Sequence, residues 1–285
     1  MRKIFEWGKD WVLTRWLNVP VGGAIEVGDV RITGLRPLGG GQKKGITKAG
    51  RLSMSGDLNG VKVKVYSVHS GAQAALRREL DRISMCGCRF PRVMASNDWL
   101  VAEEWIEGEP VNALGREGRM AVAESVDEFL EFSSRDVHVR AIAEKWNGAF
   151  CYLDDYLVGR LGPWVHWEPV VEFLDAWRES RRRVMDEVES RLSHPDLSVH
   201  NLLVQRGSSS VFVVDNELLG VGQGWVVDRM NAARGGLDVP RPQGGGADFV
   251  RFIDNTWRLR LIGSALDAGK IARACRLAKG VDWPE

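Results

Sequence analysis

Apolar and polar residues alternate along much of the first third of the chain, and this is the pattern of β-strands. The alternation is loose in some stretches and strict in others, and it covers residues 27–35, a run ending near 54, and residues 61–66, 92–95 and 100–104. The dipeptide Asn59-Gly60 precedes the strictest stretch and is typical of a tight hairpin turn. We therefore expect a sheet in this part of the chain.

Apolar residues recur at helical spacing elsewhere. One such stripe covers residues 72–85, and long helical patterns follow over 116–134, 138–159 and 168–192. Short strand-like stretches at 202–204 and 211–215 interrupt the helices, and a glycine-rich, partly helical tail completes the chain.

The change from strands to helices falls near residue 108 and predicts an α+β protein with two lobes. We expect an N-terminal amphipathic arm or helix over residues 1–24, a sheet-rich lobe over 25–107 and a helical lobe over 108–285.

Charge and composition exclude several classes of partner. The net charge of +1 gives no polyanion-binding character, so we expect no nucleic-acid partner. No stretch approaches the ~18 uninterrupted apolar residues of a membrane span, and the four cysteines form no disulfide framework or zinc-binding spacing. These features favour a cytoplasmic protein with inert thiols.

The N-terminal segment leaves one question of location open. Residues 1–17 place Trp7, Trp11 and Trp16 among charged residues, and such a segment can lie on a membrane surface or pack on its own domain. The first alternative would make the protein peripheral at the inner membrane.

The strongest chemical pattern is an aspartate followed five residues later by an asparagine. Asp196 and Asn201 have the spacing of a kinase catalytic loop. In such a loop the aspartate takes the proton of the acceptor hydroxyl or orients that hydroxyl, and the asparagine side-chain oxygen binds Mg²⁺. Asp215 then ends an apolar strand, where an isolated carboxylate is costly to bury without a cation or donor. Taken singly, each is also explained by an ordinary turn residue.

With its flanking motifs, the chain resembles the aminoglycoside phosphotransferase, choline kinase and lipopolysaccharide core sugar kinase branch of the protein-kinase-like fold, from about Val30 to Asp228. The resemblance implies a nucleotide (ATP or GTP) in a cleft between the lobes, Mg²⁺, catalysis by Asp196, and metal binding by Asn201 and Asp215. The other residues to which it assigns roles are the strand lysine Lys64, its helix partner Glu79, the phosphate-loop residues Gly39, Gly40 and Gly41, the adenine-contacting hinge residues Glu104, Trp105 and Ile106, and the braces of the catalytic loop, Asp228 and His194.

Two of these roles have competitors in the sequence. Lys62 shares a strand face with Lys64 and would suit the same role, although Val-Lys-Val-Tyr matches the family better at Lys64. Glu79 lies among charged neighbours and would equally suit a solvated helix face.

The sequence also departs from protein kinases. Ser198 stands where Ser/Thr kinases usually carry a lysine, and the short stretch from Asp215 to Asp228 leaves little room to dock a protein substrate. We therefore expect a kinase acting on a hydroxyl of a small molecule or glycan. The alternatives are a Kdo or heptose kinase at the inner membrane, whose anionic acceptor the arginines of residues 251–260 would bind, a protein kinase, and a pseudokinase that only binds nucleotide. Acidic residues over 154–175 would instead attract a cationic acceptor.

Overall fold

The computed structural model describes residues 22–38, 52–186, 188–240 and 246–281. Its first part is a six-stranded sheet in the order β1-β2-β3-β4-β7-β6, with every neighbouring pair antiparallel. The strands are β1 (Ile25–Val27), β2 (Val30–Pro37), β3 (Ser53–Leu58), β4 (Val61–Ser67), β6 (Val93–Ser96) and β7 (Leu100–Glu104).

The hairpin between β3 and β4 forms at the predicted dipeptide. Asn59 and Gly60 both have positive φ, 53° and 84°, as a two-residue hairpin turn requires. The side chain of Asp57 accepts a hydrogen bond from the Gly60 amide at 2.8 Å and fixes the turn. The hairpin prediction is therefore confirmed.

Strict alternation along β4 separates its side chains onto two faces. Val63 and Val65 are fully buried in the apolar core of the sheet. Tyr66 points to the other face, where it packs against Ala74 of helix α2 (Gly71–Leu80), and Lys64 shares that face because it lies two residues away. Helix α2 begins at Ser70, whose hydroxyl oxygen accepts a hydrogen bond from the Gln73 amide.

Two smaller sheets follow. A four-stranded sheet has the order β5-β11-β10-β8, and a two-stranded one pairs β12 with β9. Their strands are β5 (Cys88–Arg89), β8 (Gly108–Pro110), β9 (Arg191–Ser193), β10 (Leu202–Gln205), β11 (Val211–Val213) and β12 (Gly220–Gly222). Because β9 leads into residues 194–201 and β11 leads into Asp215, these sheets hold both ends of the candidate catalytic segment.

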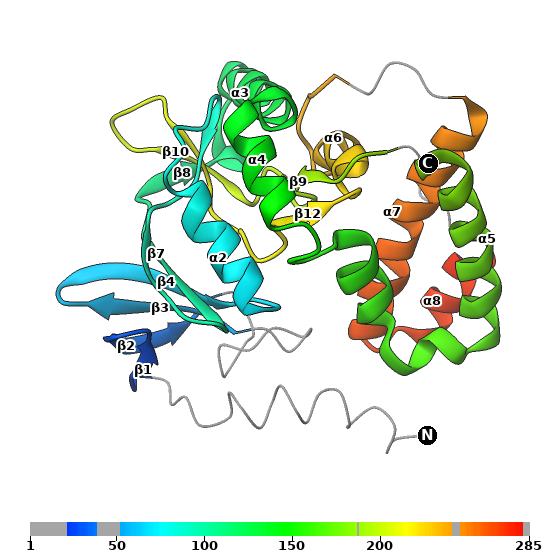
Figure 1. Cartoon of the computed structure of the whole chain (residues 1–285), viewed down its shortest axis with the longest axis horizontal. Helices are drawn as coiled ribbons and strands as arrows, with labels where there is room; N and C mark the ends of the chain where they lie inside the picture. The colour runs from blue at the N-terminus through cyan, green and yellow to red at the C-terminus, as the bar shows by residue number, and fades with distance from the viewer. Residues whose placement is uncertain (1–21, 39–51, 187, 241–245, 282–285) are drawn as a thin grey trace.

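The remaining regular elements of the described chain are helices. They are η2 (Val111–Ala113), α3 (Arg116–Arg135), α4 (Val137–Lys145), the π-helical turn η3 (Tyr152–Val158), the 3₁₀ segment η4 (Gly159–His166), α5 (Glu168–Met185), α6 (Trp225–Arg234), α7 (Ala247–Asp267) and α8 (Ile271–Ala278). Figure 1 shows α5, α7 and α8 gathered at the end of the molecule farthest from the six-stranded sheet, with α3, α4, α6 and the small sheets between. Trp177 and Phe252 stack in the apolar core shared by α5 and α7.

Three predicted helices have different bounds in the structure. The stripe over 72–85 ends at Leu80, where the chain turns. The pattern over 138–159 breaks after Lys145, because Gly148 adopts φ 77°, and continues as η3. The pattern over 168–192 ends at Met185, and its last residues form β9 instead.

Strand β12 was not predicted, because two of its three residues are glycines. An added Cβ at Gly220 would lie 2.2 Å from the Phe150 carbonyl oxygen, and one at Gly222 would lie 2.9 Å from Cys151 Sγ. The glycines are thus required by close packing against the chain before η3.

The arm expected over residues 1–24 lies almost wholly outside the described residues, and the lobe boundary near 108 stays a prediction. No helix in the described part of the chain is long and apolar enough to span a membrane.

Gly87 provides a test of how tightly the two parts of the molecule pack. It adopts φ 73°, and an added Cβ would lie 2.1 Å from the Ser125 carbonyl oxygen in α3. We expect Gly87→Ala to lower the free energy of unfolding by roughly 3 kcal/mol or more, since backbone strain and overpacking add. Gly60→Ala is the matched control: its φ is 84° with open space around it, so it should cost only about 1 kcal/mol. Equal losses in urea denaturation would contradict the packing argument.

Candidate active site

Lys64 of β4 reaches across to the end of β11. Its Nζ donates to Asp215 Oδ1 at 3.0 Å and to the Val214 carbonyl oxygen at 2.8 Å. Burial lowers the pKa of Lys64, but the carboxylates of Asp215, Glu217 and Glu103 outweigh it and raise the pKa above its usual value. The lysine is therefore charged and held on the face of β4 that is turned toward Asp215, where it can meet an anionic ligand.

Lys62, the competing lysine, is directed elsewhere. Its Nζ lies 3.6 Å from the centre of the Trp105 ring, and its side chain is exposed. The geometry therefore favours Lys64 over Lys62 as the lysine that meets phosphate.

The loop after β9 presents Asn201 beside Asp215. The side-chain nitrogen Nδ2 of Asn201 donates to the main-chain carbonyl oxygen of Asp196 at 2.8 Å. The main-chain carbonyl oxygen of Asn201 accepts from the main-chain amide of Val214 at 2.9 Å. With the amide nitrogen used inside the loop, the amide oxygen is the atom available to a cation. The first of these bonds closes the loop on itself, and the second ties it to the strand that ends in Asp215.

Asp196 lies on the side of this loop that faces helix α7. Arg260 of α7 donates through Nη2 to Asp196 Oδ1 and through Nη1 to the Pro195 carbonyl oxygen at 2.9 Å. Arg260 was expected from the sequence to bind an anionic acceptor, and its contact with Asp196 was not predicted.

A cavity of about 440 Å³ lies between the six-stranded sheet and this loop. Lys64, Asn201 and Asp215 line it together with the expected hinge residues Glu104, Trp105 and Ile106. Asp196 is not part of the lining. The volume falls in the range of small-ligand sites, so the residues assigned to the nucleotide and metal share one cavity and the assigned base stands beside it.

The donor set suits Mg²⁺. Asp215 offers a carboxylate that is about one third exposed, and Asn201 offers an amide oxygen, both hard ligands. In the described part of the chain no three His, Cys, Asp or Glu side chains form a metal cluster. Mg²⁺ commonly binds one or two protein ligands and completes its shell with phosphate oxygens and water, so these residues fit the ion when it arrives with a nucleotide.

The expected partner of Lys64 is wrong in this structure. Glu79 forms an ion pair with Lys145 of α4, and the hydrogen bond from Lys145 lowers the pKa of Glu79. Glu79 lies on the α4 side of helix α2, whereas Arg77 of the same helix is buried and reaches Glu103 of the sheet. The other interpretation, a residue on a solvated helix face, agrees in part, because the Glu79 side chain is 23% exposed and forms an ion pair with Lys145 instead of Lys64.

Glu103 is the acid that stands closest to Lys64 in the sheet. The two residues are register partners on β4 and β7, and Glu103 is completely buried. Its carboxylate accepts from Arg77 Nε at 2.6 Å, from Tyr66 Oη at 2.8 Å and from Asn216 Nδ2 at 3.1 Å. The sequence contained no local signal for Glu103, because its donors come from three distant segments.

Asn216 connects this buried carboxylate to the catalytic loop. Its Nδ2 must face Glu103, so its Oδ1 accepts from His194 Nε2 at 3.1 Å. Burial lowers the pKa of His194, which keeps the imidazole neutral with its proton on Nε2. A hydrogen-bonded chain therefore runs from α2 through the sheet to the start of the loop.

Asp228 of α6 holds the other side of the same loop. It accepts from the His194 amide at 2.7 Å and from the Ser193 hydroxyl at 3.0 Å. These contacts are those expected of a residue that braces the loop.

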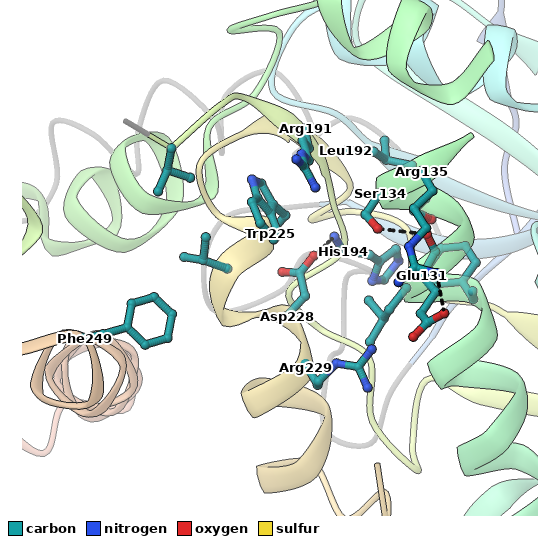
Figure 2. A pocket seen from close by; sticks show the side chains of 15 residues that line it. Glu131, Ser134, Arg135, Arg191, Leu192, His194, Trp225, Asp228, Arg229 and Phe249 are labelled. Carbon is teal, nitrogen blue, oxygen red and sulfur yellow. Dashed lines mark hydrogen bonds and ion pairs between the residues drawn. The ribbon is translucent and has the colours of Figure 1, made fainter. Parts of the chain in front are cut away.

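A second cavity, of about 370 Å³, lies behind the loop and shares no described lining residue with the first. Figure 2 shows His194 and Asp228 between Trp225 on one side and the end of α3, with Glu131 and Arg135, on the other. His194 and Asp228, the residues expected to brace the loop, thus line a cavity on one side.

Some expected residues lie outside the described part of the chain. They are Gly39, Gly40 and Gly41 of the phosphate loop and the Trp-rich residues 1–17.

No protein-family profile and no curated protein matches the chain. Solved structures do match, among them an apo form of the aminoglycoside phosphotransferase APH(4)-Ia, with a TM-score of 0.57, 14% identity, and coverage of 88% of this chain and 94% of that one. A ternary complex of the same enzyme with AMP-PNP and hygromycin B gives 0.55 at 15% identity, covering 88% and 93%. A GDP complex of an aminoglycoside 2′-phosphotransferase-IIIa variant gives 0.54 at 13% identity, covering 98% and 97%.

The likeness spans nearly the whole of each chain. The protein therefore has the two-lobed, protein-kinase-like fold of the aminoglycoside phosphotransferases, with a sheet-rich first lobe and a helical second one. The α+β, two-lobed protein-kinase-like fold expected from the sequence is confirmed.

Measurements of stability can test whether Glu103, and not Glu79, is the central acid of this region. Glu103→Gln removes the nearer counter-charge of the buried Arg77 guanidinium and leaves only Asp81, whose Oδ1 lies 3.8 Å from Nη1, so we expect the free energy of unfolding to fall by ~3 kcal/mol. Glu79→Gln removes only a partly exposed ion pair and should cost less than ~1 kcal/mol. Urea denaturation of both variants measures the difference, and the reverse order would restore Glu79 as the central acid.

The raised pKa of Asp228 should make the stability of the folded protein depend on pH. Burial raises the pKa of its carboxyl from 3.8 to about 7, although its two hydrogen bonds act in the opposite direction. The folded protein then binds this proton more tightly than the unfolded chain, so stability should fall as pH rises from about 4 to about 7. Asp228→Asn should flatten this slope when denaturation is repeated across that range. Parallel pH profiles for the two proteins would contradict the shift.

Proposed function

We propose that the protein is an ATP- or GTP-dependent kinase that transfers the γ-phosphoryl group to a hydroxyl of a small molecule or glycan. The observation that carries this proposal is the ion pair of Lys64 and Asp215 across the cavity, with Asn201 bound to the same strand. Phosphoryl transfer relies on positioning and on neutralising charge, and these side chains supply both.

Each residue has a distinct part in the proposal. Lys64 binds the phosphates nearest the sheet, and the backbone of residues 104–106 receives the base. Asp215 and Asn201 hold Mg²⁺, which supplies charge neutralisation on the phosphates. Asp196 orients the acceptor hydroxyl and receives its proton.

The nucleotide assignment is supported by the neighbours. Their structures contain GDP or AMP-PNP, and they share this fold over nearly their whole length. Both adenine and guanine nucleotides are therefore reasonable donors to test.

The acceptor is best described by its hydroxyl groups and not by its charge. The neighbours bind kanamycin or hygromycin B, which are polyhydroxylated. Two of the five acids expected to attract a cation are paired, Asp154 with Arg181 and Asp175 with Arg178.

Two of the three arginines expected to attract an anion, Arg258 and Arg260, are also occupied, whereas Arg251 is exposed. Arg258 donates to the carbonyl oxygens of Leu277 and Ala278 at the end of α8, and Arg260 contacts Asp196. This pairing weakens the case for an anionic acceptor at the membrane surface, and the proposal keeps a polyhydroxylated acceptor.

Two substitutions separate catalysis from nucleotide binding. Asp196→Asn should lower turnover at least ~10²-fold and leave nucleotide affinity nearly unchanged, because Asp196 stands outside the nucleotide cavity. Asp215→Ala should remove the Mg²⁺ dependence of nucleotide affinity. Turnover is read as nucleotide consumption with a panel of sugars, lipid-linked glycans and aminoglycosides, and affinity by calorimetry. A wild-type protein that binds ATP and GTP equally well with and without Mg²⁺, and consumes neither, would favour the nucleotide-binding module instead.

A further inference from the structure

The catalytic loop carries no lysine or arginine of its own. Between His194 and Asn201 the residues are Pro195, Asp196, Leu197, Ser198, Val199 and His200. Leu197 is buried, and among the described residues Ser198 Oγ accepts only from the His200 main-chain amide, at 3.4 Å. An aspartate in this loop would therefore face the triphosphate, which is strongly anionic, without a neighbouring cation from its own segment.

Arg260 supplies that cation from 64 residues further along the chain. Its side chain is only 18% exposed and that of Asp196 is 23% exposed, so their ion pair is largely shielded from water. The contact uses Asp196 Oδ1 and leaves Oδ2 as the oxygen that an acceptor hydroxyl can meet.

Helix α7 fixes the position of Arg260. Phe252, Thr256 and Arg260 follow each other at four-residue spacing and so share one face of the helix. Phe252 is fully buried, and Thr256 accepts a hydrogen bond from Trp177 Nε1 at 2.9 Å. The same packing that anchors the helix in the core therefore aims Arg260 at the loop.

Neighbouring groups keep the guanidinium in place and charged. It lies 5.4 Å from the centre of the Trp257 ring and next to the buried Tyr152. Burial acts to lower the pKa of Arg260, but the adjacent Tyr152 and Asp196 raise it above its usual value. Arginine stays protonated in proteins in any case, so this cation is permanent.

We propose that Arg260 is the positioning residue of Asp196: it fixes the carboxylate with Oδ2 toward the acceptor and offsets its negative charge beside the triphosphate. This inference rests on the proposed kinase function. It assigns to α7 the positive charge that Ser198 does not provide within the loop.

The transfer step shows what this position does. The acceptor hydroxyl gives its proton to Asp196 Oδ2 as its oxygen forms a bond to the γ-phosphorus. The bond between that phosphorus and the bridging oxygen breaks, and its electron pair leaves on the nucleoside diphosphate. Arg260 takes no proton and forms no bond, and it holds the receiving oxygen within reach, where a displacement of about 1 Å can cost about 10²-fold in rate.

A purely structural role must be separated from this one. Arg260 also donates to the Pro195 carbonyl oxygen, but Asn231 Nδ2 donates to the same oxygen at 3.1 Å. The loop backbone therefore keeps one donor when Arg260 is removed, whereas Asp196 Oδ1 loses the only partner that the described residues give it.

The test compares Arg260→Ala, Arg260→Lys and a matched control, Arg234→Ala. Arg234 lies at the same distance of 5.4 Å from the Trp257 ring, but it pairs with Asp254 instead of Asp196. Nucleotide consumption is measured with the acceptor of the panel that the wild-type protein phosphorylates fastest. If the protein phosphorylates none of them, hydrolysis of the nucleotide by water is measured instead. Affinity for the nucleotide is measured on the same proteins by calorimetry, and thermal unfolding is followed with each.

We expect Arg260→Ala to lower kcat ~10²-fold with little change in nucleotide affinity. Arg260→Lys should recover part of the loss, free guanidinium ion should restore activity to Arg260→Ala, and Arg234→Ala should keep the wild-type kcat. A wild-type kcat in Arg260→Ala would overturn the inference, as would a loss that guanidinium and lysine do not relieve and that follows unfolding or nucleotide affinity. If Asp196→Asn is inactive while Arg260→Ala is fully active, this inference alone fails. If the wild-type protein consumes no nucleotide at all, the proposed function fails with it.

Discussion

The structure is organised around a carboxylate that water cannot reach. Glu103 has no exposed surface, and a charge in such a place must be matched by donors of excellent geometry or it would unfold the protein. The donors come from β4, from α2 and from the turn after β11, so three segments can assemble only in one arrangement. The position of Lys64 follows from this, because it shares a strand face with Tyr66 and a register position with Glu103.

The same carboxylate governs the chemistry at a distance. Asn216 is held by Glu103 and adjoins Asp215, so the carboxylate proposed to bind the metal is positioned by its neighbour. Asn216 in turn accepts from His194, at the start of the loop that contains Asp196 and Asn201. The two sides of the cleft therefore share one polar network, and its members are buried while the groups they position remain accessible.

The sequence was sufficient where the relevant contacts were local or repeated. The β3–β4 hairpin and the face of Lys64 followed from a turn dipeptide and from strict alternation, and the pattern of Asp196, Asn201 and Asp215 followed from spacing. Strand β12 escaped because its glycines carry no hydrophobic signal. Glu103 and Arg260 escaped for another reason: their partners are distant in sequence, and a charged residue on a strand or helix looks the same whether solvent or a buried partner receives it. For Glu79 this ambiguity led to the wrong partner.

The strand β5 has a consequence for movement. Although Cys88 and Arg89 lie between α2 and β6 in the chain, they pair in parallel with β11, in the sheet that also contains β8. The first lobe is thus connected to the second at two separate places, by strand β5 and by the segment that runs from β7 into β8. Two connections restrict the relative movement of the lobes more than a single one would. In the proposed kinase, nucleotide entry and release would therefore require little separation of the lobes.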